Sequence, residues 1–537
     1  MASSTLAPSS ATLAPSTLEP SSTPENSNYT IYTPLQKRLI VTAVAVCGFF
    51  NPLTAQVYLP ALNVLASEFH VTPAKINLTV TTYMVFQGIT PILFSGFTDT
   101  LGRRPGYIIC FAIYLAANIA CALASDYTHL LIIRCFQSAG SATIMVLCQA
   151  VIADIITSAE RGGYVAITAI PSILGPSLGP VIGGAMTRYL GWRSIFWMLT
   201  ICAAVNFFMV VVFLPETCRK VVGDGSVLPK SKWNWTLWQL FRHSRRGERR
   251  QQDLGSLEQP THGGKGWKFY TAHLFSSFTL LREKELVLLL LIGGTVFTGV
   301  YAIGTAMPHQ FKTLYDFNDF EIGLLYLPMA GGSILAVALV GPGMNWNYRR
   351  HAKKLGMVVD KKKKMDLTNF PIEKVRLEIA MPLLLLGVGV VSCWGWVAAN
   401  KADIEEVCAL VFSIGVGLIG VNNAVNALIV DIFPGNAGAA LAAYNMVKCL
   451  MGAVASGAIA PMIKAMGMGK AFMIFGILYL LLGPVVVLVM KRGIVWRRER
   501  QACSHKSSPT LALLLQKPRE KSPNFSFQSL HTAPTTP

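Results

Sequence analysis

Residues 76–105 read INLTVTTYMVFQGITPILFSGFTDTLGRRP and decide the fold. About twenty mostly apolar residues come first, enough to cross the roughly 30 Å hydrocarbon core of a bilayer as a helix. The stretch then reaches Asp99, Arg103 and Arg104, whose charges are costly in lipid. A second apolar run begins at Tyr107. The stretch therefore predicts two membrane-spanning helices joined by a very short charged loop.

Long apolar blocks of this kind recur along the whole chain. Its 537 residues are 52% hydrophobic and only 14% charged, which is much less charge than a soluble protein of this length carries. We therefore expect an all-α membrane protein with twelve transmembrane helices. The predicted spans lie near residues 39–60, 76–97, 106–125, 130–152, 164–187, 194–214, 286–308, 320–342, 381–400, 406–429, 437–462 and 471–490.

The longest break between apolar blocks separates six predicted spans from six. Residues 215–285 hold an Arg cluster at 245–250 among much Gly, Gln and Ser, which predicts a cytosolic linker. The predicted organisation is a disordered tail at 1–36, an N-terminal six-helix bundle at 37–214, the linker at 215–285, a C-terminal bundle at 286–490 with a cytosolic loop at 345–380, and a basic tail at 491–537.

The net charge of +19 has two interpretations. A strongly basic chain sometimes binds nucleic acid, but most Lys and Arg here fall in loops that the predicted topology puts on one side of the membrane. That asymmetry is the positive-inside signature and places both termini in the cytosol, with no nucleic-acid partner. The 11 Cys show no metal-ligand or redox spacing and are expected to pack as small apolar side chains.

The loop after the second span carries a family motif. Residues 99–104, Asp-Thr-Leu-Gly-Arg-Arg, resemble the loop at this position in the major facilitator superfamily, although Ser95 and Thr100 replace the usual Gly and basic residue. The resemblance implies two six-helix bundles related by a pseudo-two-fold axis. The alternative is ordinary Arg on a cytosolic loop. The conformational gating residues that the motif implies are Asp99, Gly102, Arg103 and Arg104.

Three further N-terminal segments extend the resemblance. Residues 134–140 resemble an Arg-x-x-Gln-Gly-x-Gly segment of the fourth span, with Ser138 in place of the first Gly. Residues 175–184 resemble a fifth-span segment typical of antiporters, and residues 214–217, Leu-Pro-Glu-Thr, resemble the end of the sixth span in twelve-span drug:proton antiporters. The resemblance implies proton-driven export, with Arg134 in proton coupling.

The C-terminal half resembles a fungal branch that exports organic acids such as citrate, alongside multidrug relatives. The segments that carry this resemblance are 370–376, 431–435 and 444–448. In that branch the basic residue after the Asn is usually Arg. Lys448 keeps the charge but lacks the planar fork that binds a carboxylate bidentately. This departure weakens the case for a citrate-like substrate.

The glycines of the fifth span are spaced to lie largely on one helix face, where a neighbouring backbone can approach closely. The two prolines remove backbone donors and bend the helix. Such a helix between the bundles would limit leakage while they rock, and ordinary small-residue packing is the alternative. The antiporter motif comprises Gly175, Pro176, Gly179, Pro180, Gly183 and Gly184.

Two cations lie inside predicted spans. Arg134 is about one turn inside a boundary and either faces a cavity or partner or snorkels to the surface. Lys448 lies near the midplane, where snorkelling is difficult, so a water-filled cavity is expected. We expect the pair, one from each bundle, to hold an anionic substrate. The predicted substrate-binding residues are Asn51, Gln56, Arg134, Gln149, Asn422, Asn445 and Lys448, and the Asn and Gln among them alternatively serve only to bond helices together.

Asp99 is expected on the same side of the membrane as the start of the eleventh span. A helix N-terminus carries about half a positive charge and unpaired N–H groups. The topology therefore predicts that Asp99 contacts residues 436–440 when the transporter is closed to the cytosol.

These features predict a secondary active transporter that works by alternating access. It would be an antiporter that exports small organic molecules, such as drugs, organic acids or secondary metabolites, against inward proton flow. A proton-coupled uptake symporter for a small nutrient is the alternative. A membrane-embedded enzyme is disfavoured because the histidines, such as His70, His129 and His273, are scattered without catalytic partners.

The expected requirements of this transporter are few. No phosphate loop of the Gly-x-x-x-x-Gly-Lys-Ser/Thr type is present, so ATP is not expected to drive it directly. We expect no catalytic residue, no metal and no cofactor besides the proton gradient. The expected form is a monomer in the lipid bilayer, in the plasma membrane or alternatively in a vacuolar or vesicle membrane.

Overall fold

The computed structural model describes residues 30–156, 161–223, 225–227, 229, 231–236, 281–356, 370–433 and 437–506. Within these ranges the chain is helical apart from turns and caps, and it forms no strand. Side chains 95, 96, 99, 100, 161–173, 177, 220, 232, 437 and 501–506 lie outside the description even though their backbone is helical.

The N-terminal bundle begins with a span that is broken rather than continuous. It consists of α1 (Pro34–Gly48), α2 (Phe50–Val57), η1 (Leu59–Ala61) and α3 (Leu62–Glu68). The side chains of Thr33, Thr72 and Asp126 each accept a backbone N–H in the first turn of the helix that follows, which fixes where those helices begin. The remaining long helices are α4 (Pro73–Leu101), α5 (Arg103–Ala122), α6 (Tyr127–Ile155), α7 (Arg161–Leu190) and α8 (Arg193–Phe213).

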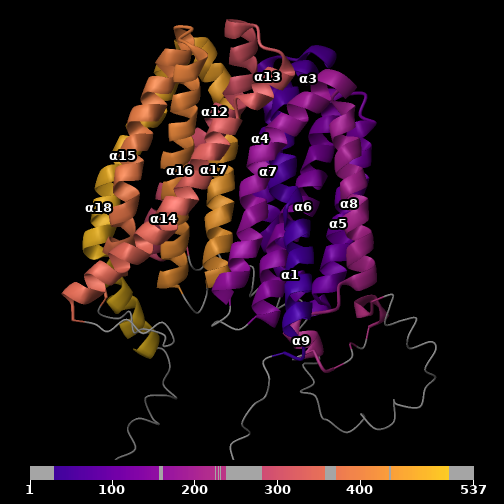
Figure 1. Cartoon of the computed structure of the whole chain (residues 1–537), viewed down its shortest axis with the longest axis vertical. Coiled ribbons are helices and arrows are strands. Elements are labelled where there is room, and N and C mark those ends of the chain that lie inside the picture. Colours follow the sequence, from indigo (N-terminus) through magenta and orange to yellow (C-terminus); the bar gives the residue numbers. More distant parts are fainter. Residues whose placement is uncertain are drawn as a thin grey trace, which may run out of the picture.

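Two short elements, α9 (Arg219–Val222) and η2 (Lys232–Asn234), follow α8. The C-terminal bundle is built from α12 (Lys284–Tyr315), α13 (Asp319–Leu324), α14 (Leu327–Lys354), α15 (Ile372–Ala399), α16 (Ile404–Ile432), α17 (Ala437–Met466) and α18 (Met468–Lys506). The two bundles stand side by side (Figure 1). The end that holds α3 and α13 is called the α13 end, and the opposite one, with α9, the α9 end.

Ten helical segments of the described chain are long and apolar enough to cross a membrane. α4 and α7, which include side chains outside the description, are of similar length, at 29 and 30 residues. An α-helix rises about 1.5 Å per residue, so each exceeds the roughly 30 Å of the hydrocarbon core. The architecture is therefore all-helical and matches the twelve predicted spans.

Several helices run past the ends of the predicted apolar spans. α14 continues to Lys354 and α18 to Lys506, although hydropathy predicts ends near residues 342 and 490. α12 likewise reaches Tyr315 rather than residue 308. The added turns are polar and lie beyond the apolar block. The helices continue there because each turn still forms its own backbone hydrogen bonds.

The bundles touch each other from the α13 end to the middle of the molecule. The Asn63 side chain donates to the Pro308 carbonyl at 2.6 Å, and the hydroxyls of Thr81 in α4 and Ser456 in α17 lie 2.9 Å apart. A Cβ placed on Gly323 of α13 would overlap a carbonyl oxygen of α7. The described conformation is therefore closed between the bundles at the α13 end.

Candidate functional site

A polar cluster joins the two bundles at mid-height. The Gln87 amide of α4 donates to the Asn51 side-chain oxygen of α2 at 2.7 Å, and Asn445 of α17 donates to the Gln87 carbonyl at 3.5 Å. The Gln56 side chain of α2 lies near the hydroxyl of Tyr301 in α12. Three of the predicted substrate-binding residues therefore lie where the bundles meet.

Lys448 lies one turn beyond Asn445 on α17 and is half-buried. Its Nζ is 4.7 Å from the centre of the Phe297 ring and 5.5 Å from that of Tyr444, and the Tyr444 hydroxyl donates to Asn422 Oδ1 at 2.9 Å. No ion pair joins Lys448 to an acidic side chain of the described chain. Aromatic faces stabilise a desolvated cation by only about 0.5–2 kcal/mol each, so this charge is left without a full counter-ion.

Arg134 is held inside the N-terminal bundle. Its guanidinium carbon lies 4.1 Å from the centre of the Tyr58 ring and 4.3 Å from that of Tyr83. Nη1 donates to Gln137 Oε1 at 2.6 Å, and the Gln137 amide donates to Asn118 at 2.8 Å. With 1% of its surface exposed, Arg134 does not snorkel.

The two cations occupy different surroundings. Arg134 contacts Tyr58 just after α2, Tyr83 of α4 and Gln137 of α6, all in the N-terminal bundle. The recorded contacts of Lys448 come from α12 and α17 of the other bundle. The Nε and Nη2 atoms of Arg134 are buried and have no hydrogen-bond partner among the described residues. The recorded contacts of the two cations share no residue, and those of Lys448 are the ones that lie beside the interface. That the pair holds one anion stays a prediction.

Gln149 lies apart from this cluster. It is exposed on α6, and the structure records no contact between it and the other predicted substrate-binding residues. Hydropathy and residue type do not reveal which side of a helix faces the partner bundle, so Gln149 and Gln56 look equivalent in the sequence.

The predicted gate lies at the α9 end, where α4 turns into α5. Gly102 has φ 113°, a left-handed conformation that favours glycine, and a Cβ there would overlap the Glu216 carboxylate. Arg104 is buried and donates to the carbonyls of Val210 and Leu214 at 2.9 and 2.7 Å. The turn is thus tied to the end of α8.

Glu216 belongs to the Leu-Pro-Glu-Thr motif at residues 214–217 and had no predicted role. Its carboxylate accepts the backbone N–H groups of Arg103 at 2.8 Å and Arg104 at 3.2 Å, at the start of α5, and those of Thr217 and Cys218 at 2.9 Å. Burial raises the pKa of Glu216, and these hydrogen bonds oppose that rise. The positive end of α5 also favours the ionised carboxylate.

The segment after α8 folds back beneath this turn. The buried Asn234 side chain donates to the Leu101 carbonyl at 3.2 Å, and the Trp235 indole donates to the Pro229 carbonyl at 2.7 Å. The Tyr32 hydroxyl donates to the Glu216 carbonyl at 3.3 Å, and burial raises the pKa of Tyr32 to about 12. The beginning of the linker is therefore part of the N-terminal bundle.

Asp99 belongs to the helical backbone of α4, but its side chain lies outside the description, as do residues 434–436. The expected contact between Asp99 and residues 436–440 stays a prediction. Arg103 of the same motif does have a described partner, because its Nε lies 2.9 Å from Asp154 Oδ2 at the end of α6.

The antiporter motif of α7 faces two different neighbours. A Cβ on Gly175 or Gly179 would press on α2 at 2.8 and 3.0 Å, and one on Gly183 would overlap the Val57 carbonyl. The next glycine, Gly184, lies instead against the Asp319 carbonyl of α13 in the other bundle. Pro176 is half-buried and Pro180 is buried, and the carbonyl of Pro180 lies against Gly323.

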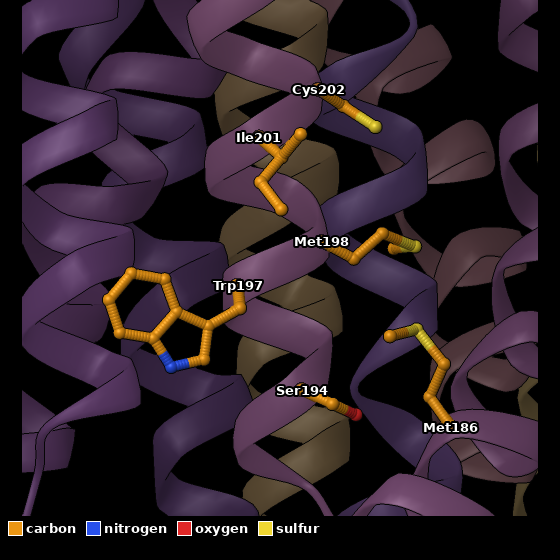
Figure 2. Close-up of a pocket in the computed structure, with 6 residues that line it drawn as sticks. All are labelled: Met186, Ser194, Trp197, Met198, Ile201 and Cys202. Carbon is orange, nitrogen blue, oxygen red and sulfur yellow. The ribbon is translucent and has the colours of Figure 1, made fainter.

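A hollow of about 360 Å³ opens on the outer side of α7 and α8 (Figure 2). Its walls are almost entirely apolar and include side chains as exposed as Ile201, at 63%. A surface of this kind suits lipid hydrocarbon and offers nothing to a charged substrate. The lining residues are Met186, Ser194, Trp197, Met198, Ile201 and Cys202.

Comparisons with known proteins agree with this architecture. The family model of the Major Facilitator Superfamily matches residues 44–456. MFS-type transporter phiD of a fungal species is 39% identical over 88% of this chain and 70% of its own length. Citrate exporter 1 of Aspergillus niger is 31% identical over 91% of each chain.

Among solved structures, a D-xylose-proton symporter superposes with a TM-score of 0.56 and 15% identity, covering 84% of this chain and 97% of that one. At this identity the likeness concerns the fold alone. The matches confirm the resemblance inferred from the motifs, including its fungal branch. This chain is a multi-pass membrane transporter that belongs to the major facilitator superfamily.

Proposed function

We propose that this transporter exports amphipathic organic anions in exchange for protons by alternating access. The observation that carries the proposal is Lys448, a half-buried cation at mid-height that lacks a described acidic partner and lies beside the polar cluster. A charge in this position is expensive unless a partner neutralises it. A substrate anion supplies that partner.

The surroundings of Lys448 favour a substrate with both polar and apolar parts. Asn422 and Asn445 provide amides, and Phe297 and Tyr444 provide ring surface within 6 Å of the ammonium. Citrate exporter 1 is named for an organic anion, which supports an anion here as well. A cationic drug would be repelled by the same field.

The proposed coupling ion is the proton, and the proposed direction is outward. The resemblance of residues 175–184 to the antiporter segment supports exchange rather than symport. Arg134 is the proposed coupling residue, since a buried cation can tune the proton affinity of a nearby acid or water. Two of its buried donor atoms have no hydrogen-bond partner in the described chain. The positive-inside asymmetry supports a cytosolic α9 end, and the plasma membrane is the proposed location.

Proteoliposomes test the proposal. Purified protein is reconstituted and a radiolabelled organic acid is presented with an imposed pH difference, with and without an uncoupler. We expect accumulation against the concentration gradient on the side that protons leave, collapsing when the uncoupler is added. Accumulation on the side that protons enter would indicate symport instead. Transport of cationic drugs alone, with no organic anion moved, would rule out the proposed substrate class.

A matched pair of variants assigns the effect to the site. Lys448→Gln removes the interfacial charge, and Lys464→Gln removes an exposed charge from the α13 end of the same helix. Only the first is expected to weaken anion transport. Equal loss in both would show a general effect of charge on α17.

A further inference from the structure

The last turns of α14 form an exposed basic face beyond the predicted apolar span. Starting from Leu327, about twenty residues cross the hydrocarbon core, which puts Trp346 near the boundary of the bilayer. The two turns that follow carry four exposed basic side chains and no acidic one. This α14 basic face consists of Trp346, Arg349, Arg350, Lys353 and Lys354.

The opposite side of the same turns is fixed to the C-terminal bundle. The Asn347 side chain, 1% exposed, donates to the Val375 carbonyl at 2.8 Å and to Glu378 at 3.0 Å. Ala352 is fully buried, and His351 lies 3.5 Å from Glu378. Because these contacts hold α14 against α15, the basic side chains are presented outward in a fixed arrangement rather than on a free loop.

The exposed charges are not neutralised within the described chain. None of Arg349, Arg350, Lys353 or Lys354 forms an ion pair there, and Arg350 lies 5.6 Å from the Trp346 ring centre. Basic residues in a last helical turn do complement the helix dipole, which accounts for Lys353 and Lys354. The dipole does not account for Trp346 at 62% exposure or for the Arg pair one turn earlier.

We propose that the α14 basic face binds the headgroup of an anionic phospholipid in the leaflet at the α9 end. Trp346 sits at the depth where tryptophan anchors to the interface, and the Arg and Lys side chains one to two turns further reach headgroup phosphate. Figure 1 shows the end of α14 standing out from the bundle at this level. The α4–α5 junction, at the same place in the N-terminal bundle, turns at Gly102 and has no such extension.

Fluorescence quenching in nanodiscs tests the site directly. The emission of Trp346 is taken as the difference between the native protein and Trp346→Phe. Nanodiscs of phosphatidylcholine have a third of their lipid replaced by brominated phosphatidylglycerol or by brominated phosphatidylcholine. We expect the brominated anionic lipid to quench Trp346 at least two-fold more strongly, because bromine quenches only at contact.

Two variants assign the preference to charge. Both brominated lipids are expected to quench Trp346 equally in a quadruple variant that removes the four charges, Arg349→Gln, Arg350→Gln, Lys353→Gln and Lys354→Gln. The control with Lys312→Gln, Lys401→Gln, Lys464→Gln and Lys470→Gln removes four exposed charges that lie toward the α13 end and should keep the preference. Should the quadruple variant fail to fold, Lys353→Gln with Lys354→Gln must still reduce the preference.

Three results would overturn the proposal. The first is equal quenching of the native protein by both lipids. The second is a preference that survives in the quadruple variant or vanishes equally in the control. The third is loss of the preference on adding inorganic phosphate at constant ionic strength, which would make the face a site for soluble phosphate instead of lipid.

Discussion

Arg376 Nε lies 2.9 Å from Asp431 Oδ2 and ties the start of α15 to the end of α16. Arg103 and Asp154 make the same contact at the same distance between α5 and α6. Each bundle therefore carries one Arg–Asp pair at the corresponding place near the α9 end. The repeat is what a pseudo-two-fold relation between halves predicts.

Arg376→Gln is expected to destabilise the protein by about 1–3 kcal/mol, between the values for exposed and fully buried pairs. The reason is that Asp431, 27% exposed, keeps its charge and loses its partner. Thermal unfolding in detergent measures the loss. Adding Asp431→Asn should recover part of it, whereas Lys374→Gln, two residues away and half-exposed, should have little effect. A double variant less stable than Arg376→Gln would contradict the pairing.

Lys448→Gln is expected to raise the apparent KM for an anionic substrate by about 10–100-fold, the range for losing one charge-assisted hydrogen bond. Lys448→Arg keeps the charge and should retain activity. Initial rates in proteoliposomes over a range of anion concentrations measure both. An unchanged concentration dependence in Lys448→Gln would remove Lys448 from the substrate site.

Arg134→Lys is expected to impair uphill export more than downhill exchange. The lysine keeps the charge but loses the planar group that stacks between Tyr58 and Tyr83 and reaches Gln137. The ratio of proton-driven accumulation to exchange without a pH difference is the quantity to compare. Arg188→Lys, exposed near the end of α7, serves as control. Proportional loss of both activities would argue against a coupling role.

Two variants, Gly183→Ala and Gly184→Ala, distinguish an effect on the stability of the N-terminal bundle from an effect on the contact between the bundles. The first presses on Val57 within the N-terminal bundle and should lower the unfolding temperature and the yield. The second presses on Asp319 across the interface and should open the α13 end. Faster hydrogen–deuterium exchange in α13 (Asp319–Leu324), specific to Gly184→Ala, would show this. Gly438→Ala, with open space around it, is the neutral comparison.

Glu216→Ala is expected to cost about 1–3 kcal/mol, because buried backbone N–H groups of residues 103, 104, 217 and 218 lose their acceptor. Glu216→Gln keeps one side-chain oxygen and should lie between. Thermal unfolding measures the relative stability of these variants, and Glu405→Gln, at an exposed position, is the reference. The assigned contact would be wrong if Glu216→Ala were as stable as that reference.

The spans themselves were predictable because an apolar block of about twenty residues has few alternatives in a membrane protein. The break in the first span after Gly48 was not, since nothing in its hydropathy separates α1 from α2. Helix extensions such as Lys354 and Lys506 were missed for the opposite reason. The added turns of α14 and α18 are polar, and contacts such as Asn347–Val375 and Arg497–Glu373 hold them against α15, which composition does not record.

The candidate site was only partly predictable from the sequence. Lys448 was singled out because charge at the midplane is rare, and it lies beside the interface. Arg134 was singled out for the same reason, but whether a buried Arg faces a cavity or two tyrosines depends on packing. The role of Glu216 required knowing that the end of α8 returns to the start of α5. A search for Arg and Asp at matching places in both halves would have found the Arg376–Asp431 pair.

The hydrogen bond from Asn234 to the Leu101 carbonyl at the α4–α5 turn bears on where the gene can be divided. A break just after α8 would strip the Leu101 carbonyl and the start of α5 of partners that are present in the intact chain. A break placed after Thr236 leaves them on the same fragment. Two separately expressed polypeptides divided there retain every contact described for the N-terminal bundle, which makes that position a suitable junction for reassembling the transporter from halves.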